Sequence, residues 1–211
     1  MSTSSTGRQS DRKDAFLFLG NQLALDFVNT RPVQNGQPSE LLPNFVAVLR
    51  WFHAAGLLNS DQVAALREEW DGSKRARGIA EAMRVLREKL RKQLLTWERG
   101  MSVHQPILDE LNNLMARHPM RTRLRAKGKS CSTELWFDPR EPEDLFAPLA
   151  HSAAILFADL HCKRVRKCAR CVLHFHDTSK KGTRRWCSMQ LCGNRLKVAA
   201  YAARQRQRTH K

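Results

Sequence analysis

Four cysteines toward the C-terminal end of this 211-residue chain are spaced as the ligands of one metal ion. They form two short-spaced pairs in the pattern C-x2-C-x15-C-x4-C, made by Cys168, Cys171, Cys187 and Cys192. Zn2+ prefers four tetrahedral ligands, and each pair of thiolates supplies two of them. Because the protein then fills every coordination position, we expect one zinc ion that stabilises the fold and takes no part in a reaction.

Two other uses of these residues have to be weighed. Cys168 and Cys171 alone have the spacing of a redox-active pair, but such pairs follow a strand of a larger sheet, and the sequence predicts no such sheet here. His174 and His176 lie between the two cysteine pairs, and an imidazole could replace one thiolate. Since four cysteines already complete the shell, we expect both histidines to lie off the metal.

The residues around the cysteines predict a small treble-clef-like zinc finger, built from a knuckle, a hairpin and a helix. Residues 172–177 and 184–187 are expected to form two short strands around a polar loop, and Ser188 is expected to cap the helix that follows. We expect this finger to have a core of its own, separate from that of the preceding residues. Its predicted members are Val172, Leu173, Phe175, Trp186 and Leu196.

The positive charge of the chain is concentrated in the same region. Residues 161–211 hold 15 Lys and Arg against one acid, a net charge of +14 out of +17 for the whole chain. Such a surface attracts polyanions, so double-stranded DNA is the predicted partner. An anionic membrane is disfavoured because no large apolar face lies beside the charge. The predicted nucleic-acid contacts are Lys180, Lys181, Arg184, Arg185, Arg195, Lys197, Tyr201, Arg204 and Arg208.

Residues 195–208 contain neither Gly nor Pro and predict a basic helix. At about 100° per residue, Lys197, Tyr201, Arg204 and Arg208 share an arc of about 60°. This face has the length and charge to lie along a phosphate backbone or in a major groove. Arg195 has two interpretations that stay open, a phosphate contact or a balance for the negative charge of zinc held by four thiolates.

The preceding residues, 15–160, predict a mainly α-helical domain with one small β-hairpin, after a disordered tail at residues 1–14. Apolar residues recur at helical spacing, most regularly over residues 79–99. Further helices are expected from Pro43 to Gly56, after a cap at Ser60, from Pro106, and over residues 149–162, where Pro148 argues against an earlier start. Strands are expected at residues 121–126 and 133–137, around a turn at Gly128.

A possible sensing role falls on four residues at the end of the first apolar segment, namely Asp26, Asn29, Thr30 and Arg31. Polar groups at such a loop could bind a small-molecule effector, and the alternative is helix capping and a satisfied turn. The sequence holds no paired catalytic carboxylates, nucleophile elbow or Gly-rich phosphate loop, so it predicts no enzyme. A homodimer stays open.

Two features that the sequence lacks predict the compartment in which the protein functions. Its first residues lack the apolar stretch of a secretory signal, and no run of 18 apolar residues exists to span a membrane. We therefore expect a cytoplasmic protein associated with the nucleoid. In that reducing compartment cysteines serve as metal ligands or thiols more often than as disulfides.

Two motifs carry a resemblance to known families. The string Cys192-Gly193-Asn194-Arg195, with RRWCSM at residues 184–189, resembles the CGNR zinc finger. The string LDFVNT at residues 25–30, followed by Trp51 and AGLL at residues 55–58, resembles the ABATE domain that accompanies this finger.

The resemblance spans about residues 16–208. It implies a bacterial, cytoplasmic, stress-induced transcription regulator, with zinc on the four cysteines and the finger as the DNA-binding part. The alternative left by the residues is an interaction module whose finger binds RNA or a protein partner.

Overall fold

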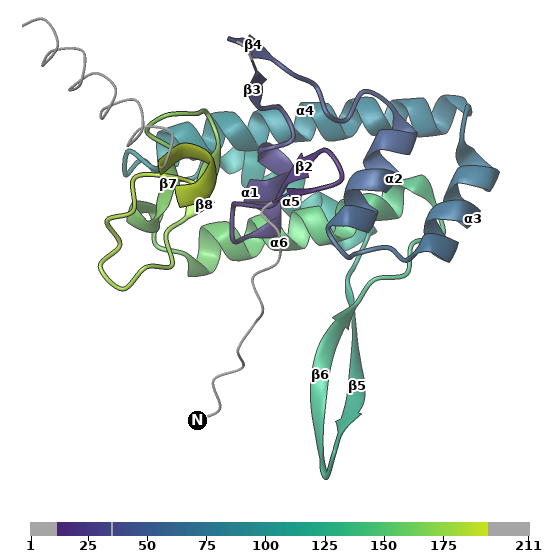
Figure 1. The fold of residues 1–211 in the computed structure, drawn as a ribbon. Helices are drawn as coiled ribbons and strands as arrows, with labels where there is room; N and C mark the ends of the chain where they lie inside the picture. The colour runs from purple at the N-terminus through teal and green to yellow at the C-terminus, as the bar shows by residue number, and fades with distance from the viewer. Residues whose placement is uncertain (1–11, 35, 194–211) are drawn as a thin grey trace, which may run out of the picture.

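The computed structural model describes residues 12–34 and 36–193 (Figure 1). Within these ranges the chain is a helical body with small antiparallel hairpins, which confirms the predicted fold class. No helix in the described residues is both long enough and apolar enough to cross a bilayer. The helices are α1 (Leu23–Val28), α2 (Phe45–Ala54), α3 (Ser60–Trp70), α4 (Lys74–Trp97), α5 (Gln105–Arg117) and α6 (Phe146–Asp159).

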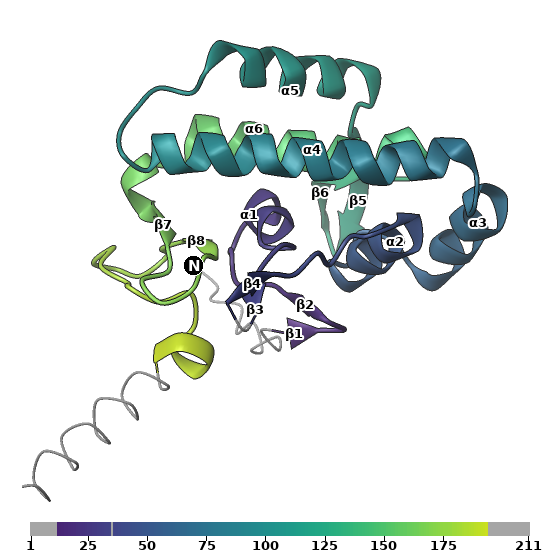
Figure 2. The same cartoon turned by 90° about the horizontal axis from the view of Figure 1, so that it is seen from above.

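Helix α4 is the long central element against which much of the body packs (Figure 2). Its buried stripe lies within the predicted range 79–99 and includes Ile79, Met83, Leu86, Leu90, Leu94 and Trp97. The helix begins five residues before the predicted start, because the hydroxyl of Ser73 caps it by accepting a hydrogen bond from the backbone of Ala76. Helices α1, α2 and α5 each contact α4, and α6 packs against α1 and α5.

Other predicted helix starts were wrong as well. Asn59, and not Ser60, caps α3, in a capping box with Gln62. Helix α6 begins at Phe146, so Pro148 stands inside its first turn. Proline is tolerated there because the first N–H groups of a helix have no acceptor within the helix.

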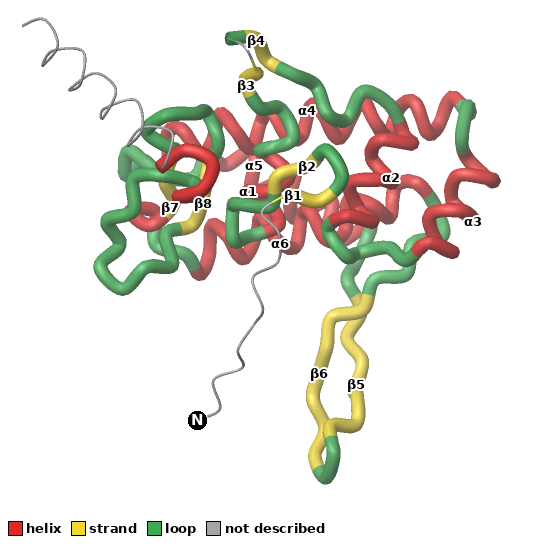
Figure 3. Tube along the Cα trace, viewed as in Figure 1, coloured by secondary structure: helices red, strands yellow, loops and turns green. Residues whose placement is uncertain are grey.

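The predicted hairpin is present and longer than expected. Strand β5 (Arg121–Lys127) pairs with β6 (Ser130–Trp136), and the pair projects away from the helical body (Figure 3). Gly128 has φ +62° in the two-residue turn, a conformation that favours glycine. A second hairpin joins β1 (Arg12–Lys13) to β2 (Phe16–Leu17), and so includes the end of the segment expected as a tail. A third joins β3 (Val33–Gln34) to β4 (Gln37–Pro38).

The hairpin of the finger has a different second strand from the one predicted. Strand β8 (His174–His176) pairs with β7 (Val165–Lys167), which precedes the first cysteine, while residues 184–187 form no strand. The physical reason is the knuckle between the two strands. The backbone N–H of Cys168 donates to the carbonyl of Leu173, at 2.8 Å, and this tight turn brings β7 and β8 side by side.

The finger has an apolar cluster distinct from the core of the helical body, and this cluster includes one buried residue from before α1. Leu19, from the segment before α1, is buried in one cluster with Leu173, Phe175 and the sulfur ligands. Trp186 packs partly buried against this cluster. Val172 is half-buried and Leu196 lies outside the described residues. The cluster of the finger therefore includes one buried leucine from the N-terminal part of the chain.

Candidate metal centre and its surroundings

The four cysteine sulfurs have the separations of a tetrahedral thiolate site. Cys171 Sγ lies 3.6 Å from Cys187 Sγ and 3.7 Å from Cys192 Sγ. The four Sγ atoms, including that of Cys168, all lie within 4.8 Å of one another. Zinc–sulfur bonds of about 2.3 Å place tetrahedral sulfurs roughly 3.8 Å apart. A disulfide needs about 2.05 Å, so these are free thiols whose arrangement fits one zinc ion.

Local backbone hydrogen bonds hold the two cysteine pairs together. The knuckle after Cys168 is tied to the second pair, because Ala169 N–H donates to the carbonyl of Arg185 at 3.0 Å. Ser188 has the capping role that was predicted, since its hydroxyl accepts from the backbone of Gln190 at 3.2 Å. Its carbonyl accepts from Cys192 N–H at 3.0 Å, in the turn Met189–Gly193, and this turn brings Cys192 back toward Cys187.

The thiol chemistry of this cluster also fits a dication. A hydrogen bond from Cys187 lowers the pKa of Cys171 to about 5. Burial, followed by the charge on Cys171, raises the pKa of Cys192 to about 12. Four thiolates at these separations repel one another, so they require a positive ion among them.

Neither histidine belongs to the sulfur cluster. His174 is buried, and its Nε2 lies 4.0 Å from the carboxylate of Glu98. Burial, helped by Arg91 and Lys167, lowers the pKa of His174 to about 4, so its ring is neutral at pH 7. The ring packs where the finger meets the helical body.

Arg184 faces inward, unlike its neighbour Arg185. The Nε of Arg184 donates to the carbonyl of Trp186 at 2.7 Å, and its Nη2 donates to the carbonyl of Cys187. Its guanidinium also stacks 4.8 Å from the centroid of the Phe175 ring. Arg184 therefore braces the segment that carries the third sulfur ligand.

The other predicted cations differ in their accessibility. Lys180 and Lys181 are exposed in the loop after β8, and Arg185 is exposed with its guanidinium 5.1 Å from the Trp186 ring centroid. The structure thus brings three exposed cations onto the loops of the finger. The remaining predicted contacts lie outside the described residues, as does the predicted basic helix: Arg195, Lys197, Tyr201, Arg204 and Arg208.

A buried aspartate shapes the loop that carries the two lysines. Asp177 Oδ1 accepts from Ser179 N–H at 3.0 Å and its Oδ2 accepts from Arg184 N–H at 2.7 Å. Burial alone raises the pKa of Asp177, but these hydrogen bonds outweigh it and lower the pKa. Arg164 donates to the carbonyls of Asp177 and Ser179, at 3.0 and 2.8 Å. Sequence reasoning missed this brace, although Asp177 is the one acid of residues 161–211.

The four residues predicted to bind an effector lie near one another, and their polar groups contact the protein itself. Asn29 is buried, and its carboxamide accepts from His174 N–H and donates to His174 C=O, both at 2.8 Å. Thr30 donates to the carbonyl of Phe27 at 2.7 Å. Arg31 is half-exposed and lies 3.5 Å from Glu88. These contacts match the capping alternative; effector binding at these residues stays a prediction.

Asp26 is the fourth of these residues and closes the turn before α1. Its Oδ1 accepts from the backbone of Gly20 at 2.7 Å, and burial raises its pKa to about 7. Gly20 has no room for a side chain, because a Cβ there would meet Leu25 Cβ at 2.6 Å. The carbonyl of Gly20 accepts from the N–H of His176, at 2.8 Å, so this turn also holds β8.

Arg87, in the middle of α4, is a buried cation. Its guanidinium forms two hydrogen bonds with the carboxylate of Glu40, and a third with Thr30 at 3.1 Å. The Glu40 bonds link α4 to the loop before α2. The sequence does not indicate that Arg87 is buried, because its partner Glu40 lies far away along the chain.

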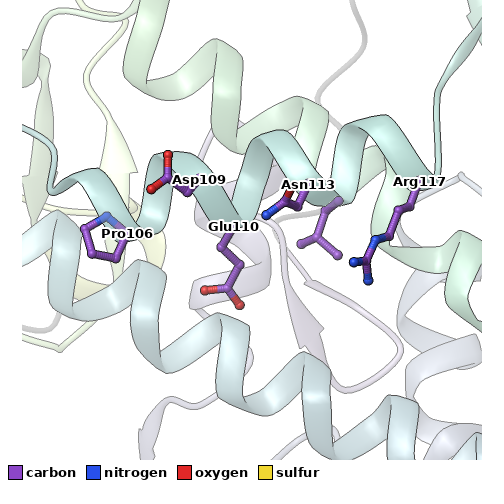
Figure 4. Close-up of a pocket in the computed structure, with 6 residues that line it drawn as sticks. Pro106, Asp109, Glu110, Asn113 and Arg117 are labelled. Carbon is purple, nitrogen blue, oxygen red and sulfur yellow. The ribbon is translucent and has the colours of Figure 1, made fainter.

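Space for a small molecule lies elsewhere, between α4 and α5. A cavity of about 470 Å3 there has Lys92, Thr96, Met101 and Ile107 in its lining. A shallower hollow adjoins it along α5, where Asp109, Glu110, Asn113 and Arg117 give it mixed charge (Figure 4). None of the four predicted effector residues lines either hollow.

The fold and the four-sulfur centre define a helical zinc-finger protein. Residues 21–160 match the model of the ABATE family, described as "Putative stress-induced transcription regulator", and residues 164–205 match the CGNR zinc finger. The chain therefore belongs to the ABATE family and carries a CGNR zinc finger, as the sequence motifs indicated. Neither description is that of an enzyme. A search of curated proteins finds no match.

Proposed function

We propose that this protein is a transcription regulator that binds double-stranded DNA through its zinc finger. The observation that carries the proposal is the set of exposed cations on loops anchored to the four-sulfur centre: Lys180, Lys181 and Arg185. Cations presented by a braced loop bind phosphates with little loss of backbone freedom. The description of the ABATE family supports the regulatory role.

Each part of the finger then has a distinct task. Zinc would be held by Cys168, Cys171, Cys187 and Cys192, and would stabilise the fold. Arg184 and Asp177 shape the segments between the ligands through the hydrogen bonds described above. Lys180, Lys181 and Arg185 contact the phosphates. The predicted basic helix at residues 195–208 adds further contacts, which also belong to the proposal.

Duplex DNA binding by the zinc-loaded full chain tests the proposal. The equilibrium constant, measured with a labelled random duplex, should fall with salt, because each phosphate contact contributes about −0.9 to the slope of log K against log salt. Replacing Lys180, Lys181 and Arg185 by Gln should flatten the slope by up to about 2.7. The matched control replaces three exposed cations of α4 by Gln: Lys74, Arg77 and Lys92.

Three outcomes would contradict the proposal. They are no binding at about 50 mM salt, a salt-independent affinity, and equal losses in the finger variant and the α4 control. Tighter binding of a single-stranded RNA of the same length would favour the RNA alternative. Sensing of an effector and formation of a homodimer stay predictions.

A further inference from the structure

The β5–β6 hairpin projects from the body with its strands open to solvent (Figures 1 and 3). Every residue of β5 is exposed, and most of β6 is as well. The 16 residues from Arg121 to Trp136 hold five Lys and Arg against one acid, Glu134, a net charge of +4. Residues 1–160 together have a net charge of only +3. The hairpin therefore accounts for the entire positive excess of the ABATE part.

Strand geometry collects four of these cations on one face. Side chains alternate between the two faces of a strand, so every second residue of β5 points the same way. The register places Trp136, Glu134, Ser132 and Ser130 opposite the four cations, on the same face. The cations of this face are Arg121, Arg123, Arg125 and Lys127.

The cationic face is organised by one acid and one aromatic ring. Glu134 Oε1 accepts from Arg123 Nε at 2.5 Å and from Arg125 Nε at 2.8 Å. The guanidinium groups of Arg121 and Arg123 lie 5.7 and 5.4 Å from the Trp136 ring centroid. These contacts restrict the long side chains before any partner binds, so binding a phosphate costs less conformational entropy. Guanidinium groups also bind phosphate oxygens in a bidentate way.

We infer that the cationic face of the β5–β6 hairpin is a second contact for duplex DNA, and that the hairpin enters the major groove. A two-stranded antiparallel ribbon fits the major groove, which is about 12 Å wide, and the minor groove is about half as wide. The inference rests on the proposed function. It adds a DNA contact from the ABATE part, separate in sequence from the finger.

The opposite face of the hairpin is apolar and suits a different partner. Leu124 is 73% exposed and Leu135 is 50% exposed, and both lie on the face away from the cations. An apolar face of this kind suits a second copy of the chain. The two faces can be changed independently, so the two partners are separable by experiment.

The first test uses three variants of the zinc-loaded full chain. In the hairpin variant, Arg121, Arg125 and Lys127 are replaced by Gln, and Arg123 stays to bind Glu134. We expect a lower DNA affinity and a slope of log K against log salt that is flatter by up to about 2.7. The α4 control with Lys74, Arg77 and Lys92 replaced by Gln should change the slope much less. Equal effects in these two variants would overturn the inference.

The third variant replaces Leu124 and Leu135 by Ser, and its DNA affinity should stay at the wild-type value. If only this variant loses DNA affinity, together with self-association in sedimentation, the hairpin is a contact between copies and the DNA inference is wrong. The hairpin contributes little to the core, so each variant should unfold at the wild-type temperature. That measurement excludes misfolding as a cause.

A second readout does not depend on charge. Cys131 is exposed on the hairpin, and a maleimide-benzophenone can be attached to it in a Cys162→Ser background. On illumination we expect a crosslink to duplex DNA, and a much weaker one from the same probe on a Lys92→Cys chain that also carries Cys131→Ser. If the chain binds DNA but the probe on Cys131 forms no crosslink, the inference about the hairpin is wrong and the proposed function is unaffected. Absence of any DNA binding by the wild-type chain would instead contradict the proposed function.

Discussion

The carboxamide of Asn29 binds both backbone polar groups of His174, a residue 145 positions away in the sequence. Asn29 follows α1 and His174 begins β8, so the pair fixes the finger to the helical body. Both hydrogen bonds are 2.8 Å long and buried. The main chain of His176 adds two more contacts, from its N–H to Gly20 C=O and from Asn21 Nδ2 to its C=O.

Replacing Asn29 by Ala should destabilise the helical body and the finger together. The change leaves a buried N–H and a buried C=O without partners, each costing about 1–3 kcal/mol. We expect the free energy of unfolding in urea to fall by about 2–4 kcal/mol, and zinc transfer to a chromogenic chelator to become faster. The control is Asn21→Ala, which removes one hydrogen bond at an exposed position. If Asn29→Ala releases zinc at the wild-type rate, the Asn29–His174 pair does not couple the finger to the helical body.

The purified chain should carry one tightly held zinc ion, because four thiolates complete a tetrahedral shell. Removing zinc, or replacing Cys187 by Ser, should loosen α1 as well as the finger. The reason is that Leu19, just before α1, is buried against the sulfur ligands. Hydrogen exchange by mass spectrometry checks this, with faster exchange expected over Leu23–Val28 and His174–His176. Loss of protection confined to the finger would show that the burial of Leu19 does not couple α1 to the finger.

Arg184 and Arg185 are adjacent arginines in different surroundings, so their Ala variants should affect different properties. Arg184→Ala removes the bonds to the carbonyls of Trp186 and Cys187 and should cost about 1–3 kcal/mol of stability, with faster zinc release. Arg185→Ala should change stability by less than about 0.5 kcal/mol and lower DNA affinity. Unfolding in urea, zinc release and DNA titration distinguish the two. Equal behaviour of the two variants would mean that the inward contacts of Arg184 contribute nothing.

Asp26 should make the stability of the chain depend on pH. Burial raises its pKa from 3.8 to about 7. The folded chain then holds this proton more tightly than the unfolded chain, so stability falls as pH rises toward about 7 and levels off above it. Each pH unit in that window corresponds to about 1.4 kcal/mol.

The variant Asp26→Asn keeps an oxygen to accept from Gly20 N–H and cannot ionise. Its stability relative to the wild type should therefore increase between pH 5 and about pH 7, as measured by urea unfolding at each pH. Asp61→Asn, at an exposed position, serves as the control. A constant difference between Asp26→Asn and the wild type across this range would show that Asp26 does not titrate as expected.

The features that sequence reasoning predicted are those encoded locally. The spacing of the four cysteines specifies a tetrahedral site, and the stripe from Ile79 to Trp97 specifies a buried helix face, because each depends on residues close along the chain. The pairing of Asn29 with His174 and of Arg87 with Glu40 could not be predicted in this way. These partners are 145 and 47 positions apart, and no periodicity relates them.

The inward orientation of Arg184 escaped prediction for another reason. Charge counting treats Arg184 and Arg185 alike, whereas the carbonyls that bind Arg184 exist only after the knuckle and the ligand turn have formed. The strand pairing of the finger was mispredicted on similar grounds. The knuckle at Cys168 selects β7 as the partner of β8, although residues 184–187 have a comparable strand pattern.

The burial of Leu19 among the sulfur ligands has a consequence for how the chain is made. Leu19 leaves the ribosome early, and Cys192 leaves it among the last of the described residues. Contacts between such distant positions form slowly and only after both have been synthesised. Leu19 therefore stays exposed until the cysteines of the finger have been synthesised, and zinc binding is the step that completes the fold. A truncated product that ends before Cys192 would lack this step and become a target for proteolysis.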